Sequence, residues 1–144
     1  MSDFKVFYEG KKVTKGELLP IDRTKNKPNL IFSKNRNDFY TIIMVDPDAP
    51  YPEKPIYKYY LHWIIINNNN EFAEYHPPSP PNDSKPHRYF FFLFKQKSIL
   101  DPNLIQKIIN RKNFNLDKFI SENNLKDVAA VYFKTGQAKN LFQK

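Results

Sequence analysis

The sequence contains no cysteine, only 3 Gly, and no long apolar run. The absence of cysteine excludes disulfide bonds, thiolate nucleophiles and cysteine-ligated zinc, and it is consistent with a reducing compartment. Apolar runs such as Tyr89 to Phe94 are far too short to span a bilayer, and the N-terminus does not have the pattern of a secretory signal. No Gly/Ser linker and no internal repeat divides the chain. We therefore expect a cytoplasmic protein made of one domain over residues 1–144.

Arginine is also scarce, with four residues among the 23 that are basic, although the formal net charge is +8. Such a charge favours anionic partners. The lysines are scattered rather than clustered, and no basic amphipathic helix is evident. We therefore expect no nucleic-acid binding and at most peripheral contact with a membrane. Abundant Lys, Asn and Ile, with the run Asn67 to Asn70, are typical of an AT-rich genome such as that of a large DNA virus or a protist.

Aromatic residues are plentiful, with 13 Phe and 9 Tyr, and they provide for one continuous core. Segments rich in β-branched and aromatic residues, bounded by turn formers, predict strands. The stronger predictions are Phe39 to Val45, Tyr57 to Ile66, Tyr89 to Lys95 and Val128 to Lys134, and the weaker ones are Lys5 to Tyr8 and Leu30 to Ser33. Both faces of Tyr57 to Ile66 are largely apolar, which predicts a strand covered on both sides.

Helical signals come late in the chain. Asp101 and Pro102 form a favoured helix start, and the apolar residues that follow would share one face: Leu104, Ile105, Ile108 and Ile109. A second helix is predicted over Leu116 to Asn123. Strands followed by short helices indicate a mainly β protein, a β-sandwich with flanking helices near the C-terminus, rather than parallel βαβ units.

Polar side chains gather where the predicted strands end. Asp46 follows one strand, His62 lies within the next, and His87 and Tyr89 begin the following one. His87 and Tyr89 point the same way because they are two residues apart. If the three strands are neighbours, these side chains meet. Two proline-rich loops, 46–52 and 76–81, would form stiff walls beside them.

These motifs resemble the signature regions of the phosphatidylethanolamine-binding protein family. The matching stretches, in order, are Asp46-Pro47-Asp48-Ala49-Pro50, Tyr60-Leu61-His62-Trp63, Pro78-Ser79-Pro80-Pro81 and His87-Arg88-Tyr89. The early strand Pro28 to Phe32 and the closing Asp127 to Phe133 also resemble the family, so the resemblance covers nearly the whole chain. It implies a Greek-key β-sandwich of two sheets.

The resemblance also implies a small pocket for phosphate-like anions, such as a phospholipid head group or a phosphorylated residue. Its expected lining is Asp46, His62, His87 and Tyr89, with Pro50 and Pro81 as apolar walls and Ser79 as a further contact. Histidine and tyrosine donors can hold phosphoryl oxygens, and a carboxylate can orient a histidine. We expect a monomer with no cofactor and no metal ion.

Other residues have structural interpretations. Asp48 is expected to cap turn amides and Arg88 to anchor a loop through a salt bridge, whereas His76 is expected to face solvent. Ser79 is the one candidate nucleophile recognised near the site, and its proline neighbours leave no nucleophile elbow, so an enzyme is not expected. Three departures from the family leave the ligand open: Tyr59 replaces an acidic residue, Ser79 replaces a glycine, and residues 82–86 lack glycine.

Three functional hypotheses follow from the resemblance. The first is a head-group- or anion-binding module that regulates signalling by contacting kinases or other proteins. The second is a protease inhibitor that acts through a surface loop. The third is a protein-interaction module whose pocket serves only the fold.

Overall fold

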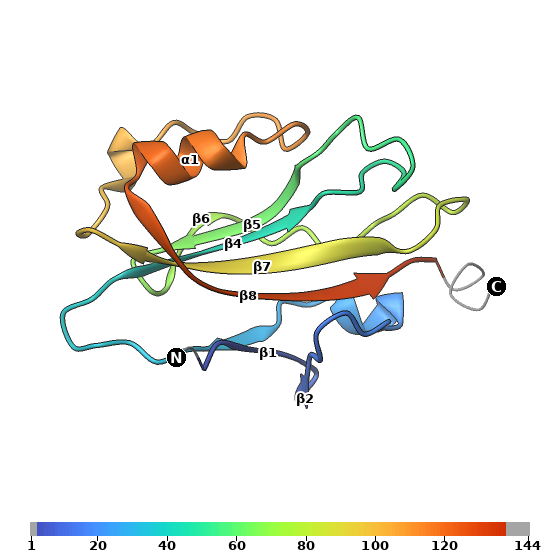
Figure 1. The fold of residues 1–144 in the computed structure, drawn as a ribbon, viewed down its shortest axis with the longest axis horizontal. Helices are drawn as coiled ribbons and strands as arrows, with labels where there is room; N and C mark the ends of the chain where they lie inside the picture. The colour runs from blue at the N-terminus through green and yellow to red at the C-terminus, as the bar shows by residue number, and fades with distance from the viewer. Residues whose placement is uncertain (1–2, 138–144) are drawn as a thin grey trace.

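The structure is a computed structural model, and it describes residues 3–137 (Figure 1). Its strands are β1 (Lys5–Tyr8), β2 (Lys11–Lys12), β3 (Asn29–Ile31), β4 (Tyr40–Asp46), β5 (Tyr60–Ile66), β6 (Asn70–Ala73), β7 (His87–Gln96) and β8 (Leu125–Thr135). Its helical segments are the 3-10 turns η1 (Ile21–Thr24) and η2 (Pro102–Leu104) and the α-helix α1 (Leu116–Glu122).

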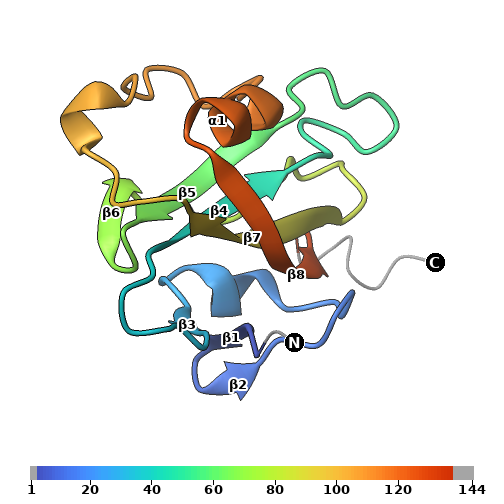
Figure 2. The same ribbon diagram turned by 60° about the vertical axis from the view of Figure 1, so that its left-hand side comes forward.

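The strands form two sheets, with the orders β2-β1-β3 and β6-β5-β4-β7-β8. In the larger sheet all neighbours are antiparallel, and β7 returns to lie beside β4, which gives the spatial order of a Greek key. Figure 2 shows the small sheet on one side of the large sheet and α1 on the other. The predicted mainly β fold with two sheets is therefore confirmed.

Strand β4 shows why the large sheet is covered on both faces. All seven of its residues are buried. Ile42 and Met44 pack in the core between the two sheets, whereas Ile43 and Val45 pack in the second core, beneath α1. This alternation follows from the two-residue period of a strand. β5 has the same property, since Trp63 belongs to the first core and Ile64 to the second, as its apolar faces predicted.

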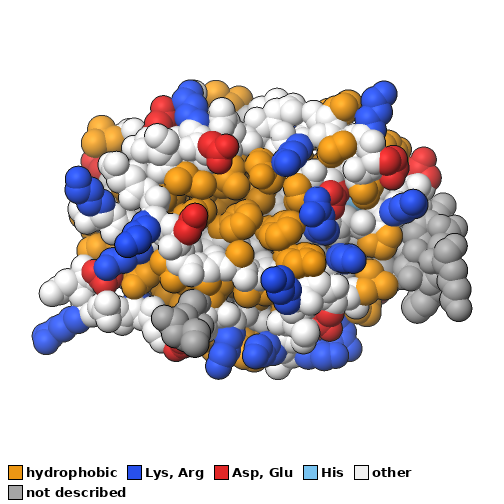
Figure 3. Space-filling view, viewed as in Figure 1, with side chains coloured by type: hydrophobic (Ala, Val, Ile, Leu, Met, Phe, Trp, Pro, Cys, Tyr) orange, Lys and Arg blue, Asp and Glu red, His pale blue; other side chains and the backbone are white. Residues whose placement is uncertain are grey.

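One part of the outer face of the large sheet is not covered by α1. Phe90 stacks on Phe92, with ring centroids 5.6 Å apart, and on Tyr132, at 4.7 Å. These rings are partly buried, and Val128 is 40% exposed nearby on β8. Figure 3 shows hydrophobic side chains gathered in the middle of this view, with lysines and arginines around them.

All six predicted strands are present, with ends that differ by up to three residues. β5 begins at Tyr60 rather than at Tyr57, because residues 57–59 still belong to the preceding turn. The short strands β2 and β6 and the 3-10 turn η1 were not predicted. Helix α1 was, and Asn115 caps it by accepting a hydrogen bond from the Lys118 amide, at 3.0 Å.

The helix predicted from Asp101 onward is wrong beyond its first turn. Asp101 does cap the start, accepting from the Asn103 amide at 2.9 Å, but η2 ends at Leu104. Residues 105–111 continue as irregular chain. Of the four apolar residues, Ile105 and Ile108 pack against the core beneath α1, while Leu104 and Ile109 are 85% and 92% exposed.

No helix among residues 3–137 is both long enough and apolar enough to cross a membrane.

Candidate functional site

A cavity of about 450 Å³ lies where β4 ends and β7 begins, next to the first residues of β5. We call it the histidine pocket. All seven residues singled out in the sequence line it: Asp46, Pro50, His62, Ser79, Pro81, His87 and Tyr89. The antiparallel register explains why these side chains lie close together, because Asp46 pairs with Tyr60 and Val45 pairs with Phe90. Three neighbouring strands thus bring their polar residues to one end of the sheet.

Asp46 and His87 form a buried pair. Asp46 Oδ2 lies 2.7 Å from His87 Nδ1, and both side chains are less than 5% exposed. Asp46 Oδ1 also accepts from the Asp48 amide at 2.7 Å, which fixes the carboxylate plane. Burial raises the pKa of Asp46, and the hydrogen bond and the charge of His87 oppose that rise. The pair therefore holds a proton between Asp46 and Nδ1.

Ser84 occupies the other nitrogen of His87. Its Oγ lies 2.8 Å from Nε2 and donates its own proton to the Lys85 carbonyl, at 2.7 Å. Because a hydroxyl has one proton, Nε2 must carry the hydrogen that joins it to Ser84. Both ring nitrogens of His87 are therefore bonded within the protein. His87 orients Asp46 and closes the floor of the histidine pocket.

Ser84, His87 and Asp46 have the connectivity of a serine-protease triad, yet two features oppose nucleophilic catalysis. A catalytic serine gives its proton to the histidine, whereas Ser84 gives it to a carbonyl and receives one from His87. Ser84 is also 1% exposed and is not among the residues that line the pocket. The arrangement serves to hold His87 in place.

His62 is held by the loop opposite. Its Nδ1 lies 2.5 Å from the His76 carbonyl oxygen, so Nδ1 carries a hydrogen and donates it. Burial lowers the pKa of His62 to about 3, and neighbouring positive charges contribute to the shift. The ring is therefore neutral at neutral pH, and its Nε2 is a hydrogen-bond acceptor. Nε2 makes no hydrogen bond with any described residue.

Tyr89 supplies an unsatisfied donor. Its side chain is fully buried, and its hydroxyl is the one buried side-chain polar atom within residues 3–137 that lacks a hydrogen-bond partner. Burial raises its pKa well above the ordinary value, and the charges of Asp46 and Asp48, with a weak contact between the hydroxyl and the Asp46 carboxylate that does not meet hydrogen-bond geometry, add to the rise. The hydroxyl therefore stays protonated. An unsatisfied buried hydroxyl costs about 1–3 kcal/mol, which a bound acceptor would offset.

The loop between β4 and β5 is held by a second ion pair. The Arg88 guanidinium donates to both oxygens of Asp48, at 3.0 Å from Nε and 2.9 Å from Nη2, and the Arg88 amide donates to Asp48 as well. The expected salt bridge of Arg88 is thus confirmed, whereas Asp48 accepts from Arg88 at the start of β7 rather than from turn amides. The peptide bond between Ala49 and Pro50 is cis.

The prediction for His76 is wrong. The His76 side chain is partly buried and lines the histidine pocket. Strand β5 holds the His76 backbone beside the pocket, because the His76 amide donates to the His62 carbonyl at 2.8 Å. Sequence reasoning also missed Ser84, Tyr57, Tyr60 and Lys112. Ser84 is three residues before His87, a spacing that could have suggested a contact. No sequence signal connects Lys112, which is 25 residues away from the start of β7.

The charges around the pocket favour an anion. Asp46 is the one acidic residue of the lining, and it is already paired with His87. Lys112 lies at the wall with its Nζ 4.4 Å from the centre of the Tyr57 ring. No group of three His, Cys, Asp or Glu side chains among the described residues is arranged to hold a metal ion.

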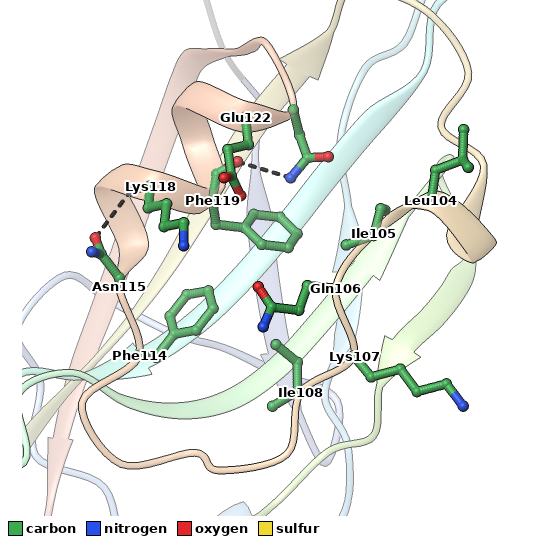
Figure 4. A pocket seen from close by; sticks show the side chains of 11 residues that line it. Leu104, Ile105, Gln106, Lys107, Ile108, Phe114, Asn115, Lys118, Phe119 and Glu122 are labelled. Atoms are coloured by element: carbon green, nitrogen blue, oxygen red, sulfur yellow. Dashed lines mark hydrogen bonds between the residues drawn. The ribbon is translucent and has the colours of Figure 1, made fainter.

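A second cavity, of about 560 Å³, lies between residues 104–108 and α1 (Figure 4). We call it the apolar groove. Phe114 and Phe119 form its floor with Ile105 and Ile108, and Lys107 and Lys118 lie at its sides. No buried polar side-chain atom without a partner faces this groove in the described part of the chain. The groove is larger than the histidine pocket, and the polar side chains that line it, Gln106, Asn115, Lys118, Glu122 and Asn123 among them, include no buried group that lacks a partner.

The fold is a mainly β sandwich of two sheets with a ligand-sized cavity at one end of its strands. The sequence model of the phosphatidylethanolamine-binding protein family matches residues 9–69 and 66–133. The chain belongs to this family. It is 47% identical over 139 residues to a phosphatidylethanolamine-binding protein homolog of Acanthamoeba polyphaga mimivirus, covering 93% of this chain and 97% of the relative.

Two further relatives show how varied the family is. The protein TERMINAL FLOWER 1 of Arabidopsis thaliana is 36% identical over 138 residues, covering 89% of this chain and 76% of the relative. A carboxypeptidase Y inhibitor, solved in complex with its cognate proteinase, superposes with a TM-score of 0.82 at 27% identity, covering 93% of this chain and 82% of that one. The similarity to a protein of a large DNA virus agrees with the composition.

Proposed function

We propose that this chain is a non-enzymatic binding protein whose histidine pocket takes a phosphate-like group, and that it regulates signalling through contacts with other proteins. The pocket is preformed, since hydrogen bonds fix Asp46, His62 and His87 in place. The observation that carries the proposal is Tyr89, a residue of the lining of this cavity of about 450 Å³ whose buried hydroxyl makes no hydrogen bond of standard geometry with any described residue. A phosphoryl oxygen is the acceptor that this donor lacks.

The chemistry of the walls supports an anion rather than a cation. An ammonium group would need a free carboxylate, and the one acidic lining residue, Asp46, is bonded to His87. Lys112 provides a flexible cation at the wall. The phosphoryl group is therefore the part of a ligand that the pocket recognises, whether it comes from a lipid head group or from a phosphorylated residue.

The test is a titration with inorganic phosphate and with phosphorylethanolamine, following the imidazole resonances of His62 and His87. We expect saturable shifts. Tyr89→Phe should weaken binding about tenfold, the loss of one hydrogen bond to a charged group, while its melting temperature stays unchanged or rises. The matched control is Tyr57→Phe, which removes a different hydroxyl at the pocket wall. Phe91→Tyr is unsuitable as a control because Phe91 is fully buried. Absence of any shift at millimolar ligand would refute the proposal.

Protease inhibition is a second candidate, favoured by the similarity to the carboxypeptidase Y inhibitor. Such inhibition would use a surface loop and would not need the pocket. An inhibition assay with a serine carboxypeptidase distinguishes the two. Inhibition that survives Tyr89→Phe supports the second candidate, and no inhibition by the wild-type chain removes it.

A further inference from the structure

The hydrogen bonding of His62 decides which of its atoms can meet a ligand. A carbonyl oxygen only accepts, so the 2.5 Å contact with the His76 carbonyl commits the Nδ1 hydrogen to the protein. Nε2 is then the ring nitrogen left for the pocket that His62 lines. Tyr89 stands beside it, with the two rings edge to face at 5.2 Å between centroids. Two neighbouring residues of the pocket lining thus carry an acceptor nitrogen, in His62, and a hydroxyl donor, in Tyr89.

An anion that carries no proton cannot form hydrogen bonds with both His62 Nε2 and the Tyr89 hydroxyl. Its oxygens accept from the Tyr89 hydroxyl, but they would face the lone pair of the unprotonated Nε2. A singly protonated phosphate can do both, since its hydroxyl donates to Nε2 and another oxygen accepts from Tyr89.

We propose that the histidine pocket binds its anion together with one proton, held between His62 Nε2 and a phosphoryl oxygen, and that this proton selects phosphate monoesters over sulfate. The inference rests on the proposed anion pocket and adds the protonation state and the class of ligand. The proton is shared in either of two equivalent forms, hydrogen phosphate with neutral imidazole or phosphate with imidazolium.

The surroundings of His62 keep it neutral until a ligand arrives. The titratable and charged groups that face it are Tyr60 on β5, Tyr89 and His87 on β7, His76 in the loop, and Arg111 before α1. Burial lowers the pKa of His62 most, the hydrogen bond to the His76 carbonyl opposes that fall, and electrostatic interactions with His76, Arg111 and His87 lower the pKa further. Asp46 does not reverse this, because its carboxylate is paired with His87. The proton therefore has to come with the anion or be taken up from solvent.

The consequence is a defined pH dependence. The second pKa of a phosphate monoester is about 6, so below that pH the ligand brings its own proton. At higher pH the complex must take up a proton, and the affinity falls by about tenfold for each unit of pH, by linkage. Sulfate carries no proton at any of these pH values, so it should bind weakly throughout.

The experiment is isothermal titration calorimetry of the full chain with O-phosphoserine and with sulfate at pH 5, 7 and 8, in pairs of buffers that differ in ionisation enthalpy. We expect an uptake near one proton at pH 8 and near none at pH 5, and phosphoserine binding at least about tenfold tighter than sulfate at pH 7. Proton uptake near zero at pH 8, or sulfate binding equal to phosphoserine, overturns the inference while leaving an anion pocket in place. No binding of phosphoserine at any pH contradicts both.

Two variants locate the proton. His62→Gln places an amide near the position of Nε2 without a group that titrates, so proton uptake should disappear and the preference over sulfate should be lost. Lys112→Gln is the control: removing this wall cation should weaken both anions alike and leave the proton uptake and the preference unchanged. Persistent uptake in His62→Gln would assign the proton to another group and overturn the inference. The measurement on the wild-type chain stands even if that variant does not fold.

Discussion

The histidine pocket and the apolar groove differ in how they are built. The pocket lies where three hydrogen-bonded strands end, and each polar side chain in it is fixed by the sheet or by a short, buried bond such as the 2.7 Å contact between Asp46 and His87. The groove lies between an irregular segment and a helix of seven residues. Backbone register forms the pocket, whereas the groove has an apolar floor of Ile105, Ile108, Phe114 and Phe119 with polar side chains at its edges.

The difference shows that cavity size is a poor guide to function. The groove has the larger volume, about 560 Å³ against about 450 Å³, yet it lacks a buried polar group in need of a partner. Specific recognition comes from a few polar groups held in fixed positions within an apolar surround. The histidine pocket has these, and the stability of the fold depends on them.

The largest effect is expected from removing Asp46. Asp46→Ala leaves His87 and the Asp48 amide buried without their acceptor, and breaking a buried pair in this way costs about 3–5 kcal/mol of the free energy of unfolding. Urea denaturation measures the loss. Asp83→Ala is the matched control, because this exposed loop residue contributes one hydrogen bond to Tyr51 and should cost less than about 1 kcal/mol. Equal losses would mean that the pocket is no better ordered than its rim.

Acid should destabilise the pocket through His62. The folded-state pKa of about 3 lies below the ordinary value of 6.5, so the unfolded chain binds the proton more readily. Its contribution to stability is complete above pH 6.5 and is lost as pH falls toward 3, amounting to about 3 kcal/mol between pH 7 and pH 4.

Denaturation curves of the wild type and of His62→Gln at both pH values provide the measurement. The difference between the two proteins isolates His62, because groups such as Asp46, whose raised pKa acts in the opposite direction, are common to both. An acid response that is the same in the variant would contradict the assignment.

Ser84→Ala should have an intermediate effect. The variant leaves the Nε2 hydrogen of His87 buried without an acceptor, at a cost of about 1–3 kcal/mol. Ser79→Ala, at an exposed position earlier in the same connection between β6 and β7, should change stability by less than about 0.5 kcal/mol. Thermal melts compare the two. A loss of stability in Ser79→Ala alone would show that the roles of the two serines are reversed.

The pocket could be predicted from the sequence because its residues lie on strong strands. The two-residue period puts His87 and Tyr89 on one face, and the resemblance to the family implied that Asp46 and His62 join them in one pocket. The partners in the loops could not be predicted in the same way. His76 and Lys112 reach the pocket, and Ser84 reaches His87 behind it, through turns that bring distant residues together, and strand periodicity carries no information about them.

The helix predicted beyond Asp101 shows the opposite case, a local pattern that tertiary contacts overrule. The spacing of Leu104, Ile105, Ile108 and Ile109 fits a helical face, but the chain must also pass Arg111 close to β5, where the Leu61 amide donates to the Arg111 carbonyl at 2.9 Å. The guanidinium of Arg111 donates in addition to the carbonyls of Leu61 and His62. These bonds hold the segment in an extended path, and half of its apolar residues remain exposed.

The smallest effects distinguish the observed path from a helix. In a helix, Leu104 and Ile108 would share a face, and their replacement by serine would cost the same. In the structure Leu104 is 85% exposed, whereas Ile108 packs against the core beneath α1. We expect Ile108→Ser to lower the free energy of unfolding by about 1–2 kcal/mol and Leu104→Ser to change it by less than about 0.5 kcal/mol, measured by urea denaturation. Similar losses of stability at both positions would support the helix predicted from the sequence instead of the observed path.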